Sequence, residues 1–183
     1  MKICIFYTSP KLGDIILQLP FIKAISDHYK TKVIVCVNKY INIKDILVKQ
    51  EYISSVIENP FRKGKFYLKD FLNLYKEIKK EKINFAYILD KTKAPAIVCK
   101  LAKIDKIFGF GIGSQKYFVD QSCRLSKEDL RYNYTLQSIK FLKKLDIPFK
   151  FEDKYLVLDN NHELDIINKN QDLEKPWACF AVD

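Results

Sequence analysis

Short apolar runs alternate with amphipathic stretches along most of this chain. The apolar runs predict buried strands over residues 3–7, 33–37, 53–57, 85–89 and 106–110, with a last strand over 177–182. Between them, apolar residues recur at helical spacing, most clearly over residues 68–82. Further helices are expected over residues 15–28, 43–48, 94–103, 129–145 and 164–168.

This alternation of strands and helices determines the predicted fold class. Helical connections between successive strands give a mostly parallel sheet with helices on both faces. The chain therefore predicts an α/β, Rossmann-like domain over residues 1–158, and its 183 residues are enough for one sizeable core. The polar stretch at residues 159–174 is the best linker candidate, and residues 175–183 begin a further strand.

The turn after the first predicted strand carries the most informative residues. Residues 9–20 read SPKLGDIILQLP, so a Gly-Asp pair stands between a strand and a helix. Gly13 permits backbone angles that other residues avoid, and Asp14 stands where a carboxylate caps a helix N-terminus. The turn also follows the carboxyl end of a strand, where open α/β sheets bind ligands. Asp14 therefore has two interpretations, a plain helix N-cap and a reactive carboxylate that is ionised at neutral pH.

The same stretch resembles the opening motif of the heptosyltransferases, glycosyltransferase family 9, which add heptose to the lipopolysaccharide inner core of bacteria. The motif is KLGDIILxLP, from Lys11 to Pro20. Further matching pieces follow in order: YILD at 87–90, IFGFG at 107–111, RYNY at 131–134, KLDIP at 144–148 and KPWACF at 175–180. The resemblance therefore spans nearly the whole chain.

The resemblance implies a fold, a reaction and a catalytic base. The family has a GT-B fold, in which two Rossmann-like domains face each other across a cleft. This chain would supply the N-terminal, acceptor-binding half and the first strand of the donor-binding half. The implied reaction is the inverting transfer of heptose from a nucleotide-activated donor to a lipopolysaccharide core acceptor. Asp14 stands at the position of the family's general base, and little transfer is expected from residues 1–183 alone, whether they are a fragment or pair with a separate chain.

Basic residues at predicted strand ends are candidates for acceptor binding. Lys11 stands beside Asp14, while Arg62, Lys63 and Lys65 follow the third predicted strand among aromatic residues. In the resembling family a basic loop at this place holds the acidic acceptor, and arginine can engage a carboxylate or phosphate through two hydrogen bonds. Solvated loop charge is the alternative, and a basic run with aromatic residues also suits single-stranded nucleic acid.

Two further polar residues complete the predicted acceptor site. Asp90 closes the fourth predicted strand, and Arg131 lies near the start of the helix expected from residue 129. Capping of the following helix is the alternative for Asp90, and a core or surface role is the alternative for Arg131. Lys91 departs from the family, in which a neutral glutamine commonly follows the acid. If the sheet forms as predicted, Asp14, residues 62–65 and Asp90 should share one edge of it.

No metal or other cofactor is predicted. The two histidines and five scattered cysteines form no ligand motif, and the resembling family is usually described as metal-independent. The GFGIG at residues 109–113 lacks the spacing of a dinucleotide loop. The cysteines, at positions 4, 36, 99, 123 and 179, are typical of reduced, buried thiols.

The net charge of +10 leaves several partners open. Such a chain would be attracted to a nucleic acid, an anionic membrane surface or a phosphorylated acceptor. The alternative is that the lysines are spread over solvated faces and their charge serves no partner. We predict a lipopolysaccharide core acceptor and a nucleotide-sugar donor, with peripheral contact to the inner membrane as an option, and we do not favour nucleic acid. With no evident signal peptide and no apolar run near ~20 residues, a cytoplasmic location is predicted.

Two other functions remain open from the sequence. One is a half-domain that holds an anionic glycan without catalysing a reaction. The other is a basic α/β domain that binds nucleic acid, for which a continuous basic face would be required.

Overall fold

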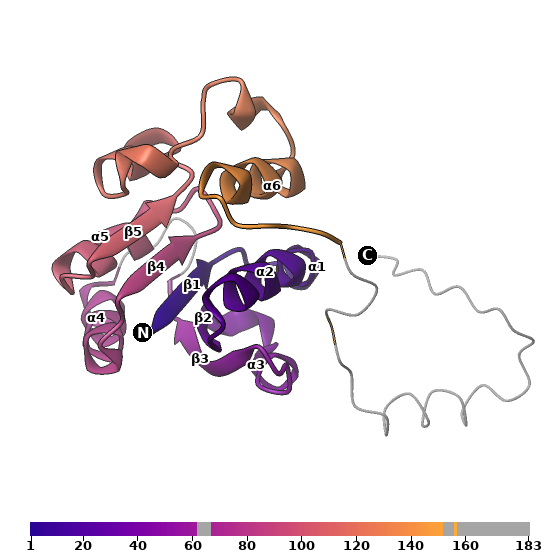
Figure 1. The fold of residues 1–183 in the computed structure, drawn as a ribbon. Helices are drawn as coiled ribbons and strands as arrows, with labels where there is room; N and C mark the ends of the chain where they lie inside the picture. Colours follow the sequence, from indigo (N-terminus) through magenta and orange to yellow (C-terminus); the bar gives the residue numbers. More distant parts are fainter. Residues whose placement is uncertain (62–66, 152–155, 157–183) are drawn as a thin grey trace, which may run out of the picture.

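The computed structural model describes residues 1–61, 67–151 and 156 of the chain (Figure 1). Within these residues one five-stranded sheet has the order β3-β2-β1-β4-β5, and every neighbouring pair is parallel. The strands are β1 (Ile3–Tyr7), β2 (Val33–Asn38), β3 (Ile53–Asn59), β4 (Phe85–Ile88) and β5 (Lys106–Gly109). The predicted Rossmann-like α/β class is confirmed.

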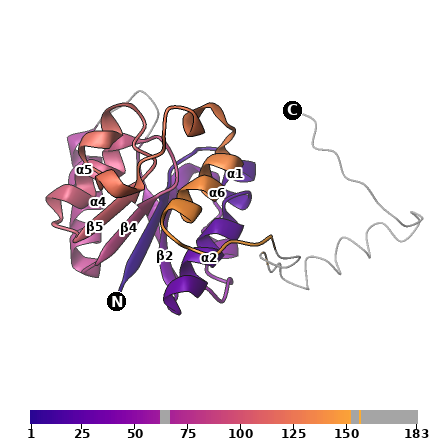
Figure 2. The same cartoon turned by 45° about the horizontal axis from the view of Figure 1, so that its top comes forward.

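Helices cover both faces of the sheet, as Figures 1 and 2 show. The α-helices are α1 (Leu12–Ile16), α2 (Leu19–Tyr29), α3 (Lys44–Leu47), α4 (Leu68–Glu81), α5 (Lys93–Leu101) and α6 (Tyr134–Lys144). Short 3₁₀ helices are η1 (Lys39–Ile41), η2 (Gly113–Tyr117), η3 (Gln121–Cys123) and η4 (Asp129–Arg131). Within residues 1–61, 67–151 and 156, no helix has the length and apolar character needed to cross a membrane.

Alternate residues of the strands feed two separate cores. Ile3 and Ile5 of β1 pack with buried residues of α2, α3 and α6, whereas Cys4 and Phe6 pack with those of α4 and α5. Because both faces of the sheet are covered, every residue of β1 and β2 is buried. This explains why these strands are continuous apolar runs in the sequence and do not alternate with polar residues.

The strand order creates a switch point at the centre of the sheet. From β1 the chain proceeds through β2 to β3 on one side, and then crosses to β4 on the other side of β1. Connections that follow β1 and β4 therefore leave the sheet in opposite directions. In open α/β sheets the crevice at the carboxyl ends of two such strands is the usual place for a ligand.

The single helix predicted over residues 15–28 is wrong, because the structure has two helices there. α1 begins at Leu12 and ends at Ile16, and α2 begins at Leu19. Pro20 stands in the first turn of α2, and it has no amide hydrogen to donate to the carbonyl of Ile16. A continuous helix would therefore lose a hydrogen bond at this point, whereas the first turn of a new helix accepts proline without that loss.

The helix predicted over residues 129–145 is also divided. Between η4 and α6 the chain is extended at Tyr132, and Asn133 is the N-cap of α6. The Asn133 side chain accepts a hydrogen bond from the amide of Leu136 at 3.0 Å. The Gln137 amide donates to the carbonyl oxygens of Leu130 and Tyr132, at 3.2 and 2.7 Å. These side chains satisfy the backbone groups that a continuous helix would have paired.

The cysteines in the described residues are buried thiols, as predicted. Cys4, Cys36, Cys99 and Cys123 are unpaired and buried. Burial raises the pKa of each of these thiols, so each stays protonated and unreactive at neutral pH. Cys179, the predicted linker, the domain boundaries beyond residue 156 and the elements predicted over 164–168 and 177–182 lie outside the described residues.

Two glycine substitutions test the packing beside β5. A Cβ atom at Gly109 would lie 2.9 Å from Cγ1 of Val119 and 3.3 Å from Oε1 of Gln115. We expect Gly109→Ala to lower the free energy of unfolding by about 1–3 kcal/mol, because the neighbours must move. Gly13→Ala is the control: its Cβ meets nothing within 4 Å, and alanine is the better helix former by about 0.5–1 kcal/mol. Urea denaturation of both variants checks this, and equal stabilities would contradict it.

Candidate functional site

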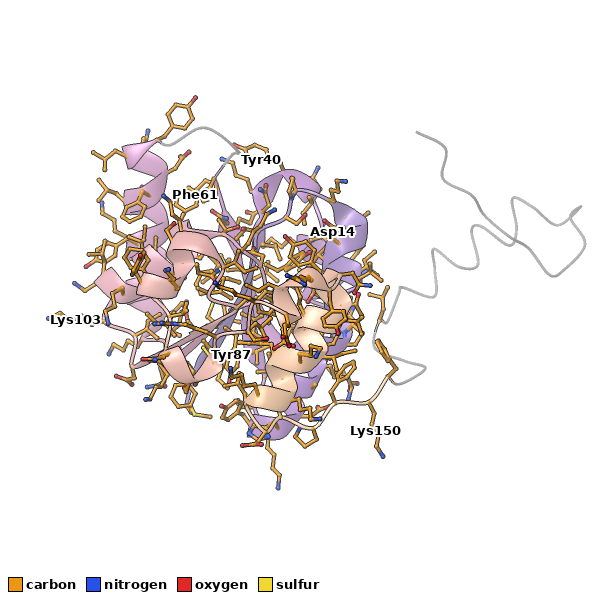
Figure 3. All side chains as sticks on the ribbon, turned by 90° about the horizontal axis from the view of Figure 1, so that it is seen from above. Asp14, Tyr40, Phe61, Tyr87, Lys103 and Lys150 are labelled. Atoms are coloured by element: carbon orange, nitrogen blue, oxygen red, sulfur yellow. The ribbon has the colours of Figure 1, made fainter. Side chains whose placement is uncertain are left out.

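The candidate site lies at the carboxyl edge of the sheet, around the switch point between β1 and β4. Residues 8–14 follow β1 and residues 89–92 follow β4. Because all the strands are parallel, Asp14 and Asp90 lie at the same edge, as predicted. Figure 3 views the molecule from above and labels Asp14 together with Tyr40 and Phe61, which follow β2 and β3. Arg62, Lys63 and Lys65 lie outside the described residues, so their place in the shared edge stays a prediction.

Asp90 joins the ends of β1 and β4. Its Oδ2 atom accepts hydrogen bonds from the amide and the hydroxyl of Thr8, both at 2.7 Å, and its Oδ1 accepts from the amide of Thr92 at 2.7 Å. Asp90 is only 6% exposed. Burial raises the pKa of its carboxyl above the usual value, and the hydrogen bonds from Thr8 and Thr92 oppose that rise. The geometry thus gives Asp90 a structural role, and its predicted contact with an acceptor stays untested.

A buried glutamine supports this connection from the side of β5. The Gln115 side-chain amide donates to the carbonyl oxygens of Asp90 and Thr92, at 2.8 and 3.1 Å. Its Oε1 accepts from the amide of Gly111 at 2.9 Å, where Gly111 has a φ of +75°. Gln115 is fully buried, and these bonds use both of its N–H donors. Sequence reasoning missed Gln115, because a lone glutamine in a loop carries no pattern that indicates burial.

Asp14 is the third residue of α1 and is half-buried. The helix N-cap is Lys11, so the interpretation of Asp14 as the N-cap is wrong. Its Oδ2 accepts a hydrogen bond from the Ser9 hydroxyl at 2.6 Å. Gly13 has no positive φ, so the backbone freedom expected of it is not used. A Cβ atom at Gly13 would meet nothing within 4 Å, so packing does not require a glycine there either.

Tyr7 lies in the electrostatic field of both carboxylates. Burial raises the pKa of the Tyr7 phenol most, and the charges of Asp14 and Asp90 raise it further. Tyr134, the first residue of α6, contributes in the same direction and so stands close to this group. The Tyr7 hydroxyl therefore stays protonated and neutral at neutral pH. It adds no charge to the edge that the two carboxylates share.

The other predicted contacts in the described part of the chain are exposed. Lys11 is exposed at the start of α1, directly before the helix that holds Asp14. Arg131 is exposed in η4, three residues before α6 begins. Both side chains are accessible to a ligand, and whether either binds an acceptor stays a prediction.

Two asparagines at the same edge were missed in the sequence. Asn38 and Asn59 end β2 and β3 and are paired in register. Asn38 Nδ2 donates to the carbonyl of Phe61 at 3.2 Å, and Asn59 Oδ1 accepts from the amide of Phe61 at 3.1 Å. They hold the chain at the point where the basic run begins. Polar residues that end two neighbouring parallel strands were the available indication.

Of the two acids predicted for this edge, Asp14 is the one that a solute can reach. Asp90 is buried and takes three hydrogen bonds, whereas Asp14 is half-buried and takes one, from Ser9. A half-buried carboxylate at a switch point can accept a proton or hold a hydroxyl group. In the described ranges, no group of three or more His, Cys, Asp and Glu residues is placed to hold a metal ion.

Comparisons with known proteins identify the fold. No protein-family model matches the chain, and no curated protein matches it. It is similar to the solved structure of Escherichia coli ADP-heptose lipopolysaccharide heptosyltransferase II, with a TM-score of 0.66 and 16% identity, over 92% of this chain and 50% of that chain. The Veillonella parvula glycosyltransferase of family 9 gives a TM-score of 0.70 at 12% identity, over 94% and 50%.

A third similar structure is the E. coli heptosyltransferase WaaC with ADP-2-deoxy-2-fluoro heptose, at a TM-score of 0.60 and 15% identity, over 85% of this chain and 52% of that chain. The chain therefore spans about half the length of these structures. The resemblance to heptosyltransferases is confirmed at the level of the fold, which is that of one half of a GT-B glycosyltransferase.

Asp90→Asn tests the connection between β1 and β4. It keeps the size of the side chain but turns one acceptor oxygen into an NH₂ group that faces donors. We expect the free energy of unfolding, measured in urea, to fall by about 1–3 kcal/mol. Asp105→Asn, at an exposed acid before β5, is the matched control and should stay within about 0.5 kcal/mol of the wild type.

The same pair of variants tests the pKa of Asp90. Folding raises the pKa of Asp90. Its contribution to the free energy of unfolding is therefore fully present below the unfolded-state pKa near ~3.9. That contribution is lost as the pH rises through the folded-state pKa. The difference in unfolding free energy between the wild type and Asp90→Asn should therefore be larger in mild acid than at neutral pH. The opposite trend would show that the hydrogen bonds outweigh burial.

Proposed function

We propose that this chain is the acceptor-binding half of a glycosyltransferase of the heptosyltransferase type. The observation that carries the proposal is the position of Asp14. Its half-buried carboxylate follows β1 at the switch point of a fold that is similar to one half of the heptosyltransferases. The motif from Lys11 to Pro20, which resembles the opening motif of that family, surrounds this residue.

In the proposed reaction, Asp14 takes the proton of an acceptor hydroxyl. The hydroxyl oxygen forms a bond to the anomeric carbon of a nucleotide-activated heptose, and the bond from that carbon to the nucleoside diphosphate breaks. Attack from the face opposite the leaving group inverts the anomeric centre. General-base assistance of this kind contributes about 10²–10⁴-fold to a rate.

The proposed acceptor is an anionic sugar of the lipopolysaccharide core. Lys11 stands beside Asp14 and is exposed, so its ammonium can pair with a phosphate or carboxylate. Arg62, Lys63 and Lys65 remain proposed acceptor contacts, and Arg131 is a further one. Asp90, which is buried and bonded to Thr8 and Thr92, would serve the acceptor site by holding its backbone in place. The donor would bind chiefly to a second half of the kind that the similar structures have, and we propose no metal and no cofactor besides the donor.

The proposed location follows from these substrates. We propose that the reaction takes place in the cytoplasm, the location predicted from the sequence. Peripheral contact with the inner membrane would follow where the acceptor is anchored in that membrane.

A half-domain that binds an anionic glycan without catalysis is the second candidate. The observation in its favour is the exposed Lys11 beside Asp14, which can pair with an anionic group whether or not a reaction follows. Binding without transfer by every preparation that contains residues 1–183 would favour it over the enzyme.

Asp14→Asn tests the proposed base. The variant keeps the shape of the side chain and its acceptor oxygen for Ser9, but an amide does not take up a proton at neutral pH. In an active preparation, in which a donor-binding half accompanies residues 1–183, we expect the transfer rate to fall by about 10²–10⁴-fold. Acceptor affinity, measured by calorimetry, should change little. A fully active Asn variant would remove Asp14 from the mechanism.

Lys11→Gln tests the acceptor side without any transfer assay. Residues 1–183 alone should bind an acidic core oligosaccharide, and the affinity should fall as salt rises, because exposed charges are screened over about 10 Å at ~0.1 M salt. Lys11→Gln should weaken binding by about 3- to 10-fold, roughly 0.7–1.4 kcal/mol.

Lys32→Gln is the matched control for this binding experiment. It removes the same charge from an exposed lysine just before β2, at the opposite edge of the sheet. Calorimetry should find its affinity unchanged. Equal weakening by both variants would indicate binding through net charge alone.

Residues 1–183 by themselves should show no robust turnover without a donor-binding half.

A further inference from the structure

We infer that Ser9 is a positioning residue, which fixes the Asp14 carboxylate so that one chosen oxygen faces the acceptor hydroxyl. The inference rests on the proposed function of Asp14 as the base, and it adds a residue and an orientation that the motif alone does not assign. The geometry that carries it is the hydrogen bond from Ser9 Oγ to Asp14 Oδ2, at 2.6 Å.

The direction of this hydrogen bond follows from the neighbouring donor. A serine hydroxyl has one hydrogen to donate and two lone pairs that accept. The amide of Lys11 points at Ser9 Oγ from 3.4 Å, and an amide can only donate. The Tyr7 hydroxyl is a second neighbour of Ser9, and their contact lowers the pKa of the Tyr7 phenol against the larger effect of burial. A protonated Tyr7 can donate to Ser9, whereas a carboxylate oxygen can only accept. Ser9 therefore accepts from Lys11 and directs its own hydrogen to Asp14.

Ser9 is held in place by its neighbours along the chain. Thr8 is fixed by two hydrogen bonds to Asp90 Oδ2, and its Oγ1 lies 2.9 Å from Thr92 Oγ1. Pro10 follows Ser9, and a residue before proline is restricted to extended backbone angles. Ser9 is therefore attached to the buried connection between β1 and β4, and its hydroxyl also accepts from Lys11, the N-cap of the short helix that holds Asp14.

The consequence is that the two oxygens of Asp14 are not equivalent. Oδ2 is occupied by Ser9, while Oδ1 accepts no hydrogen bond from any residue in the described ranges. Oδ1 is thus the oxygen that remains to take a proton. Asp14 is half-buried, so part of its side chain is accessible to a solute. In the proposed arrangement the acceptor hydroxyl meets Oδ1 while Oδ2 keeps its contact with Ser9.

The test compares Ser9→Ala with Ser9→Thr in the active preparation described above. Ser9→Ala removes the hydroxyl, so Asp14 can rotate, and we expect kcat to fall by about 10- to 100-fold with the KM for the acceptor little changed. Ser9→Thr restores a hydroxyl and should recover most of the rate. A merely structural role would instead lower stability and raise KM, without rescue of kcat by threonine.

A double variant connects the effect to Asp14. In the Asp14→Asn background, adding Ser9→Ala should change the rate by less than about 2-fold, because there is no longer a base to orient. A full additional loss there, or wild-type kcat in Ser9→Ala, would overturn the inference.

The outcomes also separate this inference from the proposed function. If Asp14→Asn transfers at the wild-type rate, the proposed base is wrong. If Asp14→Asn is inactive while Ser9→Ala is fully active, the base stands and only the positioning role fails. Acceptor binding by residues 1–183, measured by calorimetry, should be the same for Ser9→Ala and the wild type in either case.

Discussion

The connection between β1 and β4 through Asp90 is the interaction on which the candidate site depends. At a switch point two neighbouring strands send their connections in opposite directions, so few backbone contacts join the two loops beyond the strand ends. Here the carboxylate of Asp90 binds the amide and hydroxyl of Thr8 and the amide of Thr92. A carboxylate can accept several hydrogen bonds at once, which a neutral side chain of the same size cannot. The carboxyl edge of the sheet thereby gains a fixed floor made from both strands.

The cost of burying this acid is visible in its pKa. Burial raises the pKa of Asp90 despite the hydrogen bonds that favour the charged form. The group therefore lowers stability at neutral pH relative to its own protonated form, although its hydrogen bonds are well formed. A loss of folding stability of this kind is found at sites where the fixed geometry of the side chains matters more than stability. Gln115 adds to the same floor from the β5 side, through the carbonyl oxygens of Asp90 and Thr92.

Much of the fold follows from the sequence because its strands are buried on both faces. Uninterrupted apolar runs such as residues 33–37 are hard to misplace, and the amphipathic helix from Leu68 is equally clear. The errors fall where a local rule competes with periodicity. Pro20 divides the first predicted helix, and Asn133 with Gln137 divides the last one. In both places the apolar spacing continues across the break, so periodicity alone does not reveal it.

The candidate site was less predictable than the fold. Strand ends are visible in the sequence, so Asp14 and Asp90 were correctly expected at one edge. Capping of the next helix was one prediction for Asp90, and its bond to the amide of Thr92, the N-cap of α5, agrees with it. Its bonds to Thr8 were not predicted, because they depend on residues far away in the sequence. Thr8 and Asp90 are 82 residues apart, and Gln115 reaches Asp90 across 25. The sequence around each residue does not reveal hydrogen-bond partners that lie so far away in the chain.

The two acids show how one sheet edge can carry both structure and chemistry. A carboxylate that is buried and surrounded by donors cannot reach a solute or change its protonation readily, so it serves the framework. A half-buried carboxylate with one oxygen held by a hydroxyl keeps its orientation and stays partly accessible. Asp90 meets the first description and Asp14 the second. Because Thr8 and Ser9 are adjacent, Asp90 fixes the end of β1, which carries the hydroxyl that holds Asp14. The reactivity proposed for Asp14 would therefore depend on the integrity of the sheet.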